Sequence, residues 1–491
     1  MVKAVVGEDA QLKLVEDRLS QSALPAEVGL VIGKLSSTLD RGFVLDLIPT
    51  PQNDSNEPAC AIMDSSKDDK RKSSKSKSLV NDSSSLFIDM DWVAEHARQV
   101  SRMLVGGIKV VGIYIWVSES AFKNSTVVLC QTVKGVAEAA SSLWTDWDER
   151  LLLHICYSPR RWNCRNCSLS SNITSSSLRP CDFKMGKVLS SLQMFRCMYN
   201  FNLRLPIFHE NASKFQTVSD ALHRAISIHA KELKDAKALI DGGLVVDNEQ
   251  WSSGGVHEVE LLLPFMNNSP VEACSQRDVL GILYFSGSIC SFAYLNSKEP
   301  ISQAITDVKG DIIMSLQSRL DIICDEAEDD SGSNPDDSTE ASDEISTEKT
   351  VAKLILQLLR NRKGCSLPLP RRVFAPWLAG IYVCDYLQPS ETVEVLRDHC
   401  TELLSVKSPA DDSTILEPEK EASALISKSF WDIAVPFGLA IQHLGENEGS
   451  IEDRGERSSK SSKPVSINVV SAALILSLAI VIGFAILVLK G

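Results

Sequence analysis

The sequence predicts an α/β (α+β) fold, because strand-like and helix-like patterns alternate along most of its 491 residues. Short runs of β-branched residues indicate strands, and apolar residues three and four apart indicate helices. With 44% apolar and 23% charged residues, the chain can fill real cores, which excludes a wholly disordered protein. The formal net charge of −14 argues against nucleic acid as the main partner, because phosphate binding needs clustered Lys and Arg.

The first elements expected are a short strand, a helix and a β-hairpin. The N-terminus reaches its first acid by residue 8 and has no long apolar stretch, so it does not read as a signal peptide. Leu12, Val15 and Leu19 have the spacing of one helix face. The β-rich runs 28–35 and 42–48 flank a polar turn-like segment, and this pattern predicts a hairpin.

Helices and strands continue to alternate as far as residue 323. A helix over 93–104 should end at Gly106 and Gly107, because glycine favours helix ends. The uninterrupted apolar run 108–117 is typical of a buried central strand. The other expected elements are helices at 133–144 and 305–323 and strands at 151–156, 256–264, 279–285 and 289–295.

Three polar tracts divide the chain. Residues 64–85 are rich in Ser and Lys and predict a disordered loop within the first folded region. Residues 325–348 hold eleven acids and no base, which predicts a disordered linker. Residues 445–464 predict a flexible tether. The folded parts expected from this division are 1–324 and a smaller α/β segment at 349–444.

The strongest single signal is a transmembrane helix near the C-terminus. Residues 465–489 contain no charge, and as a helix they would be about 37 Å long, enough to cross a bilayer core with some tilt. Only two residues follow, so we expect insertion after translation, with the rest of the chain in the cytosol. The apolar character and the single terminal positive charge favour the endoplasmic reticulum membrane. The anchor residues include Val465, Leu474, Ile480, Phe484 and Leu489.

Thirteen cysteines are scattered along the chain, which fits reduced thiols better than a disulfide framework. Cys164 and Cys167 form a C-x-x-C pair that could bind metal, with His154, Cys156 and Cys181 nearby as further ligands. No second pair has matching spacing, so free thiols beside a loop are the alternative. The sequence contains no phosphate-binding loop, kinase signature, nucleophile elbow or H-E-x-x-H motif.

The order of hairpin, helix and buried strand resembles the MPN fold of the JAMM metalloproteases. In the active enzymes of that family, a Glu before the first strand, two His and a later Asp accompany a catalytic zinc. Glu27 matches the Glu, but Ile115 and Val117 fall at the two His positions, and neither side chain can bind a metal. The resemblance therefore implies an MPN-like pseudoenzyme domain without catalytic residues. An ordinary surface acid is the alternative reading of Glu27.

Longer strings extend a resemblance over essentially the whole chain. They are similar to the ODR-four-like family (odorant response abnormal protein four homologues), in its plant form. The resemblance implies a membrane-anchored protein of the endoplasmic reticulum, implicated in folding or delivery of odorant receptors. It also implies partnership with the protease that removes the ubiquitin-fold modifier. The strings are KAVVGED, VGLVIGKLSSTLDRGFVLDLIPTP, DWVAEHARQVSRMLVGGIKVVGIYIWV, HICYSPRRWNCRNC and PRRVFAPW.

Together, the anchor and the resemblance predict a non-catalytic, membrane-anchored adaptor. It would recruit or stabilise the ubiquitin-fold-modifier-specific protease and assist receptor folding or trafficking. One alternative is a receptor-maturation chaperone that binds client membrane helices directly, and another is an active protease. The expected partners are the MPN-related protease, the lipid bilayer and membrane receptors, without nucleic acid and without a cofactor.

Overall fold

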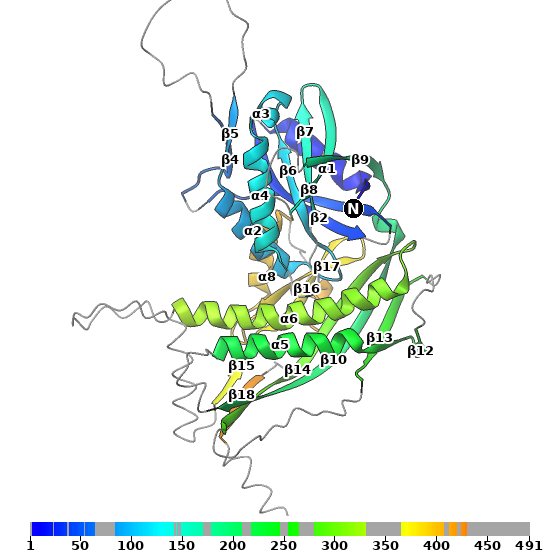
Figure 1. The fold of residues 1–491 in the computed structure, drawn as a ribbon, viewed down its shortest axis with the longest axis vertical. Helices are drawn as coiled ribbons and strands as arrows, with labels where there is room; N and C mark the ends of the chain where they lie inside the picture. Colours follow the sequence, from blue (N-terminus) through cyan, green and yellow to red (C-terminus); the bar gives the residue numbers. More distant parts are fainter. Residues whose placement is uncertain are drawn as a thin grey trace, which may run out of the picture. The chain divides into compact units, whose positions relative to one another are not determined.

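A computed structural model describes the protein over most of its first 429 residues (Figure 1). All the described residues belong to one compact unit, Met1–Ala434. The described ranges are 2–22, 24–36, 39–53, 55–63, 84–141, 144, 149–169, 178–208, 218–245, 254–264, 279–329, 365–406, 412–419 and 424–429.

The N-terminal part is a closed barrel with strand order β1-β3-β2-β6-β7-β8-β9. The expected hairpin is confirmed, because β2 and β3 pair in antiparallel register. Strand β6 lies between β2 and β7 and is almost wholly buried, as its apolar run predicts. The bounds are β1 Ala4–Glu8, β2 Glu27–Ser36, β3 Arg41–Pro49, β6 Lys109–Trp116, β7 Glu149–Tyr157, β8 Arg160–Ser168 and β9 Leu178–Gly186.

Helices cover both faces of the barrel sheet. Helix α1 (Asp9–Gln21) buries the predicted stripe of Leu12, Val15 and Leu19 against one face. Helices α2 (Met90–Met103) and α4 (Thr126–Ala139) pack against the other face. The short helix α3 (Glu119–Asn124) follows β6, and β4 (Cys60–Met63) pairs with β5 (Ser85–Ile88) beside it.

Helix α2 ends at Met103, before the glycine pair that was expected to end it, because the C-cap residue Leu104 already has an extended backbone. The backbone φ angles of Gly106 and Gly107 are +70° and +82°, a left-handed region that side chains with a Cβ rarely adopt. The chain can therefore turn sharply from α2 into β6. Helix α4 begins earlier than the 133–144 segment expected and ends at Ala139, so its first turn falls before the periodic apolar residues.

A second sheet has strand order β12-β11-β13-β10-β14-β18-β15. Helices α5 and α6 lie side by side across one of its faces (Figure 1). Alternate residues of β10, including Phe195 and Tyr199, share an apolar core with Val308 and Ile312 of α6. The bounds are β10 Leu192–Phe208, α5 Val218–Asp235, β11 Lys237–Ile240, β12 Gly243–Leu244, β13 Val256–Leu262, β14 Val279–Asn296, α6 Ile301–Asp329, β15 Cys365–Pro368 and β18 Ala424–Ser429.

Two expectations in this region differ from the structure. The two strands expected at 279–285 and 289–295 are one strand, because β10 pairs with β14 over its whole length. The ladder therefore continues through Gly287, in the gap between the two expected strands. Helix α6 runs to Asp329, so the first residues of the expected linker 325–348 are helical.

The segment after the acidic tract returns to the same compact unit. Strands β15 and β18 extend the second sheet through pairing of β14 with β18. The hairpin of β16 (Arg371–Leu378) and β17 (Ile381–Leu387) shares the core of α2 and α4, and α8 (Val393–Leu404) packs beside it. The described part of the expected 349–444 segment is thus built into the fold of 1–324.

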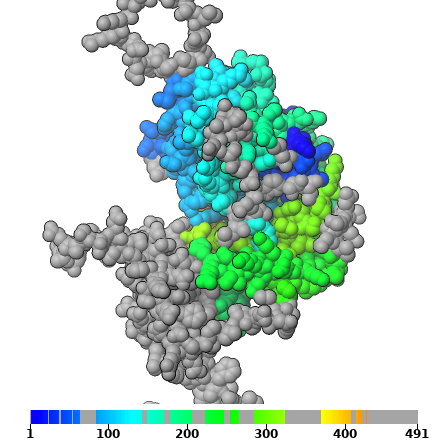
Figure 2. Space-filling model, viewed as in Figure 1, coloured from blue at the N-terminus to red at the C-terminus, as the bar shows by residue number. Residues whose placement is uncertain are grey.

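Buried ion pairs join these parts. Arg372 of β16 donates two hydrogen bonds of 2.9 Å to Asp311 of α6, and both side chains are almost fully buried. Arg319 of α6 donates one hydrogen bond to Glu419, and its other N–H groups donate to the Pro370 carbonyl and the Ser315 hydroxyl; the Arg319 and Glu419 side chains are also buried. Lys34 of the barrel lies 2.6 Å from Asp307 of α6. Figure 2 shows the blue and cyan residues of the N-terminal part directly adjoining the green residues that follow in the sequence.

No helix in the described part of the chain is long and apolar enough to cross a membrane. The expected anchor 465–489 and tether 445–464 lie outside the described residues, as do residues 64–83 of the expected loop. The transmembrane helix therefore remains a prediction from the sequence.

The Arg372–Asp311 pair should contribute strongly to stability. An Arg372→Met variant leaves Asp311 buried without its counter-ion, so we expect the free energy of unfolding to fall by about 3–5 kcal/mol. Urea denaturation of the full chain in detergent, followed by tryptophan fluorescence, measures the change. Lys3→Met, which removes a solvent-exposed pair with Asp40, should leave stability nearly unchanged. Equal losses in the two variants would contradict this role for the buried pair.

Candidate functional site

Glu27, the expected MPN position, lies at the start of β2 and is held by two neighbours. Arg18 of α1 donates hydrogen bonds of 2.8 and 3.0 Å to its carboxylate. The Tyr114 hydroxyl of β6 donates a third bond of 2.6 Å. Only 10% of the Glu27 side chain is exposed. Glu27 therefore ties α1 to the barrel and is not an ordinary surface acid.

Ile115 and Val117 lie on the other side of the sheet from Glu27. The register of β2 and β6 places Glu27 opposite Trp116, which lies between Ile115 and Val117 in the sequence. Successive side chains of a strand point to opposite faces. Ile115 and Val117 are fully buried in the core beneath α2 and α4. The structure does not bring the three positions together, so they form no shared metal site.

Asp46 of β3 lies in the same charged region as Arg18. Burial raises the pKa of the Asp46 carboxyl to about 6. The Leu47 N–H, 2.8 Å from the carboxylate, and the Arg18 charge both act in the opposite direction, toward a lower pKa. The desolvation of this carboxylate therefore exceeds the gain from its partners.

The C-x-x-C pair does not act as one unit. Cys164 and Cys167 are three residues apart on β8, so their thiols point to opposite faces of the sheet. Cys164 lies directly opposite Cys181 of β9, while Cys167 lies beside Cys130 of α4. All four are free thiols. The spacing that suggested a two-thiol metal site is that of a helix or loop, whereas these residues form a strand.

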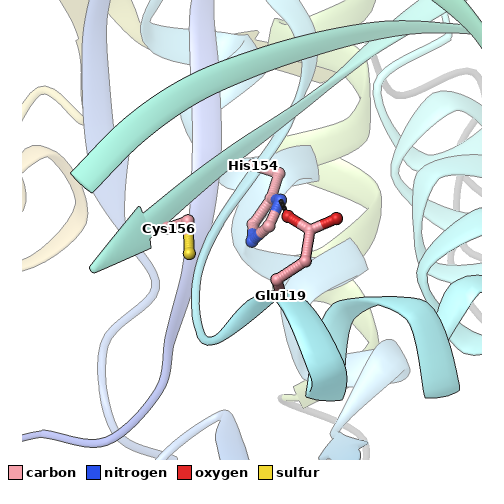
Figure 3. A group of neighbouring side chains, drawn as sticks. All are labelled: Glu119, His154 and Cys156. Carbon is pink, nitrogen blue, oxygen red and sulfur yellow. Dashed lines mark ion pairs between the residues drawn. The ribbon is translucent and has the colours of Figure 1, made fainter. Parts of the chain in front are cut away.

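A different set of side chains does converge. Glu119 is the first residue of α3, and His154 and Cys156 are two residues apart on β7, so the latter two share a face. One possible ligand atom from each lies within 4.8 Å of the others. Figure 3 shows the Glu119 carboxylate beside the His154 ring, with Cys156 next along the strand. His154 and Cys156 are buried.

The His154 ring is held by one of its nitrogen atoms and by an aromatic stack. Nε2 lies 3.1 Å from the Val117 carbonyl oxygen, and the ring stacks on Phe122 at 4.1 Å. A carbonyl only accepts, so Nε2 carries the proton and donates it. Nδ1 lies 3.9 Å from a Glu119 oxygen and has no hydrogen-bond partner among the described residues. Burial lowers the pKa of His154, which favours this neutral ring.

Sequence reasoning found this cluster only in part. The sequence suggests His154 and Cys156 as further ligands for the C-x-x-C pair, and no motif in it singles out Glu119. A usable signal was present: His-x-Cys on a predicted strand places both side chains on one face, and the acid comes directly after the neighbouring strand. The parallel pairing of β6 with β7 then brings these positions together.

Most of the chain is similar to one known protein family. Residues 29–415 match the family profile described as "ODR4-like: Odorant response abnormal 4-like". The protein is a member of the ODR4-like family. The matched span includes β16, β17 and α8, in agreement with their place in the same compact unit as the barrel.

Several ODR4-like relatives are similar over most of their length. The protein odr-4 homolog of Mus musculus is 26% identical, covering 80% of this chain and 81% of the relative. The Xenopus laevis homolog is 23% identical over 97% of this chain and 98% of its own. The Dictyostelium discoideum homolog is 26% identical over 83% and 82%. These similarities cover most of the chain.

One solved structure shows a weaker similarity. The crystal structure of UfSP from C. elegans matches 83% of this chain and 57% of its own, with 9% sequence identity and a TM-score of 0.35. Similarity at this level does not establish a shared fold. The MPN-like character of the ODR4-like barrel therefore remains a prediction from the sequence.

Asp46 should make stability depend on pH. The folded protein keeps this proton up to about pH 6, whereas the unfolded chain releases it near pH 4, so stability falls as pH rises through that window. Asp46→Asn removes the effect. We expect the unfolding free energy of the variant, relative to the parent, to rise by up to about 3 kcal/mol between pH 4 and pH 7.

Urea denaturation at the two pH values measures this difference. Asp40→Asn is the matched control: Lys3 lowers the pKa of Asp40, so the contribution of Asp40 to stability changes mainly below pH 4, and the difference of this variant from the parent should stay nearly constant between pH 4 and pH 7. A pH-independent difference between Asp46→Asn and the parent would show that folding does not raise the pKa of Asp46.

Proposed function

We propose that this ODR4-like protein is a non-catalytic, membrane-anchored adaptor of the endoplasmic reticulum. The main support for this proposal comes from the side chains that occupy the expected zinc positions. Ile115 and Val117 are fully buried among apolar side chains, and Glu27 is engaged by Arg18 and Tyr114. These positions serve the packing of the barrel, which supports a role in binding and not in hydrolysis.

The uncharged segment 465–489 supports the membrane part of the proposal. A tether would hold the folded unit close to the bilayer and so raise the effective concentration of any bound partner near membrane substrates. Function then depends on location and needs no chemistry from this chain. The Met1–Ala434 unit would act as the binding module.

The partner we propose is the MPN-related protease specific for the ubiquitin-fold modifier, on the basis of the resemblance in the sequence. The family description, odorant response abnormal, supports a connected role in the folding or trafficking of membrane receptors. A chaperone that binds client membrane helices directly is a second candidate, favoured by the length of the uncharged segment.

A pull-down in mild detergent tests where the partner binds. Full-length protein and a 1–464 truncation, which keeps the compact unit entire, serve as baits. We expect both to recover the modifier-specific protease to a similar extent, because the binding surface should lie in the folded part. Recovery with the full-length bait alone would place binding in the anchor segment and contradict the adaptor arrangement.

An anchor exchange separates the adaptor from the chaperone. Residues 465–489 are replaced by an unrelated transmembrane helix that targets the same membrane, and receptor delivery is measured in cells lacking the native protein. An adaptor should keep its full function after the exchange. Loss of function despite correct targeting would favour direct binding of client helices.

Catalysis is tested directly on the purified full-length protein. We expect no cleavage of ubiquitin-fold-modifier conjugates by the protein alone. Cleavage that disappears with Glu27→Gln would instead establish an active protease.

A further inference from the structure

We propose that Glu119, His154 and Cys156 bind a divalent transition-metal ion, with Zn²⁺ the best match to their chemistry. A carboxylate, an imidazole and a thiolate are all established zinc ligands, and the mixture suits a borderline-soft cation better than Mg²⁺ or Ca²⁺. This set shares no residue with the C-x-x-C pair or with the expected MPN positions. It is independent of the proposed adaptor function.

The orientation of His154 is the main argument. Its Nε2 proton is donated to the Val117 carbonyl, the outer contact that metal-binding histidines commonly make. Its Nδ1 lone pair then faces a Glu119 oxygen 3.9 Å away. Two acceptors that face each other in a buried site repel unless a cation lies between them. Nδ1 has no hydrogen-bond partner among the described residues, and its side chain is 1% exposed.

The distances allow a metal ion with small side-chain adjustments. Zinc binds nitrogen and oxygen at about 2.0–2.2 Å and sulfur at about 2.3 Å, which places tetrahedral ligand atoms roughly 3.3–3.8 Å apart. The Nδ1–oxygen distance of 3.9 Å is close to this, and one nitrogen of the His154 ring, a Glu119 oxygen and the Cys156 sulfur lie within 4.8 Å of one another. Rotation of the Cys156 thiol, which now donates weakly to the Ser158 carbonyl at 3.5 Å, would close the remaining gap.

A cation bound here needs negative charge beyond that of Glu119, because two basic side chains already contact this carboxylate. The Glu119 carboxylate also contacts Arg161 at 2.9 Å and Lys123 at 3.4 Å, so positive charge is already present. Glu119 and a Cys156 thiolate together supply two negative charges, equal to the charge of the ion. The thiol proton leaves to solvent on binding. Arg161 would then orient the carboxylate as an outer partner.

Three protein ligands leave one coordination position for water. The ion would connect the start of α3 to the end of β7, two elements that otherwise meet here through the His154–Phe122 stack. The expected effect on the protein is a local clamp at this end of the barrel.

Cobalt titration of the full-length protein in detergent tests the site. Co²⁺ replaces Zn²⁺ and reports a thiolate ligand through a near-ultraviolet charge-transfer band. We expect one equivalent to give this band, and Zn²⁺ to abolish it by displacement. Cys156→Ser should remove the band. Cys164→Ser, a buried thiol on the neighbouring strand outside the cluster, should keep it.

Glu119→Gln provides a variant that is expected to fold, since its side chain is 25% exposed. It should weaken cobalt binding by at least about tenfold, the scale seen when partners in a metal site are lost. Absence of the band in the parent protein, or a band of full strength in Cys156→Ser, would overturn the proposal. If Cys156→Ser fails to fold, an unchanged cobalt affinity of the Glu119→Gln variant is by itself enough to overturn the proposal.

Discussion

Two buried ion pairs determine how this chain is put together. Arg319 and Asp311 of α6 each pair with a residue that follows the acidic tract, Glu419 and Arg372 respectively. A buried charge without a counter-ion is strongly unfavourable, so each partner requires the other to be in place. Helix α6, which packs on the second sheet, and the segment from residue 365 onward are therefore mutually dependent, and the buried Lys34–Asp307 pair joins the barrel to the same helix.

Local features of the fold were predictable because their signals are local. The stripe of Leu12, Val15 and Leu19 marks a helix within its own sequence, and the apolar run 108–117 marks a buried strand. The continuity of β14 was not predictable, because Gly287 reads as a turn until its partner β10 is known. The place of β16 and β17 was missed for the same reason, since their contacts lie far away in the sequence.

The residues of the candidate site were also predictable only as far as their signals are local. The C-x-x-C pair was the most visible motif, yet strand geometry separates Cys164 from Cys167. His154 and Cys156 are less conspicuous, but a spacing of two on a strand brings them to one face. Glu119 joins them only through the tertiary arrangement of β6 and β7. The spacing of a motif therefore indicates a metal site only when the secondary structure that contains the motif is known.

The pairing of β14 with β18 has a consequence for biosynthesis. Residues 279–296 leave the ribosome long before residues 424–429 exist, so one edge of the sheet stays open while the rest of the chain is made. An open strand edge is a template for pairing with other chains. The nascent protein consequently exposes an unpaired strand edge during this interval. A chain that terminates early would carry a permanent aggregation-prone edge and become a substrate for quality control.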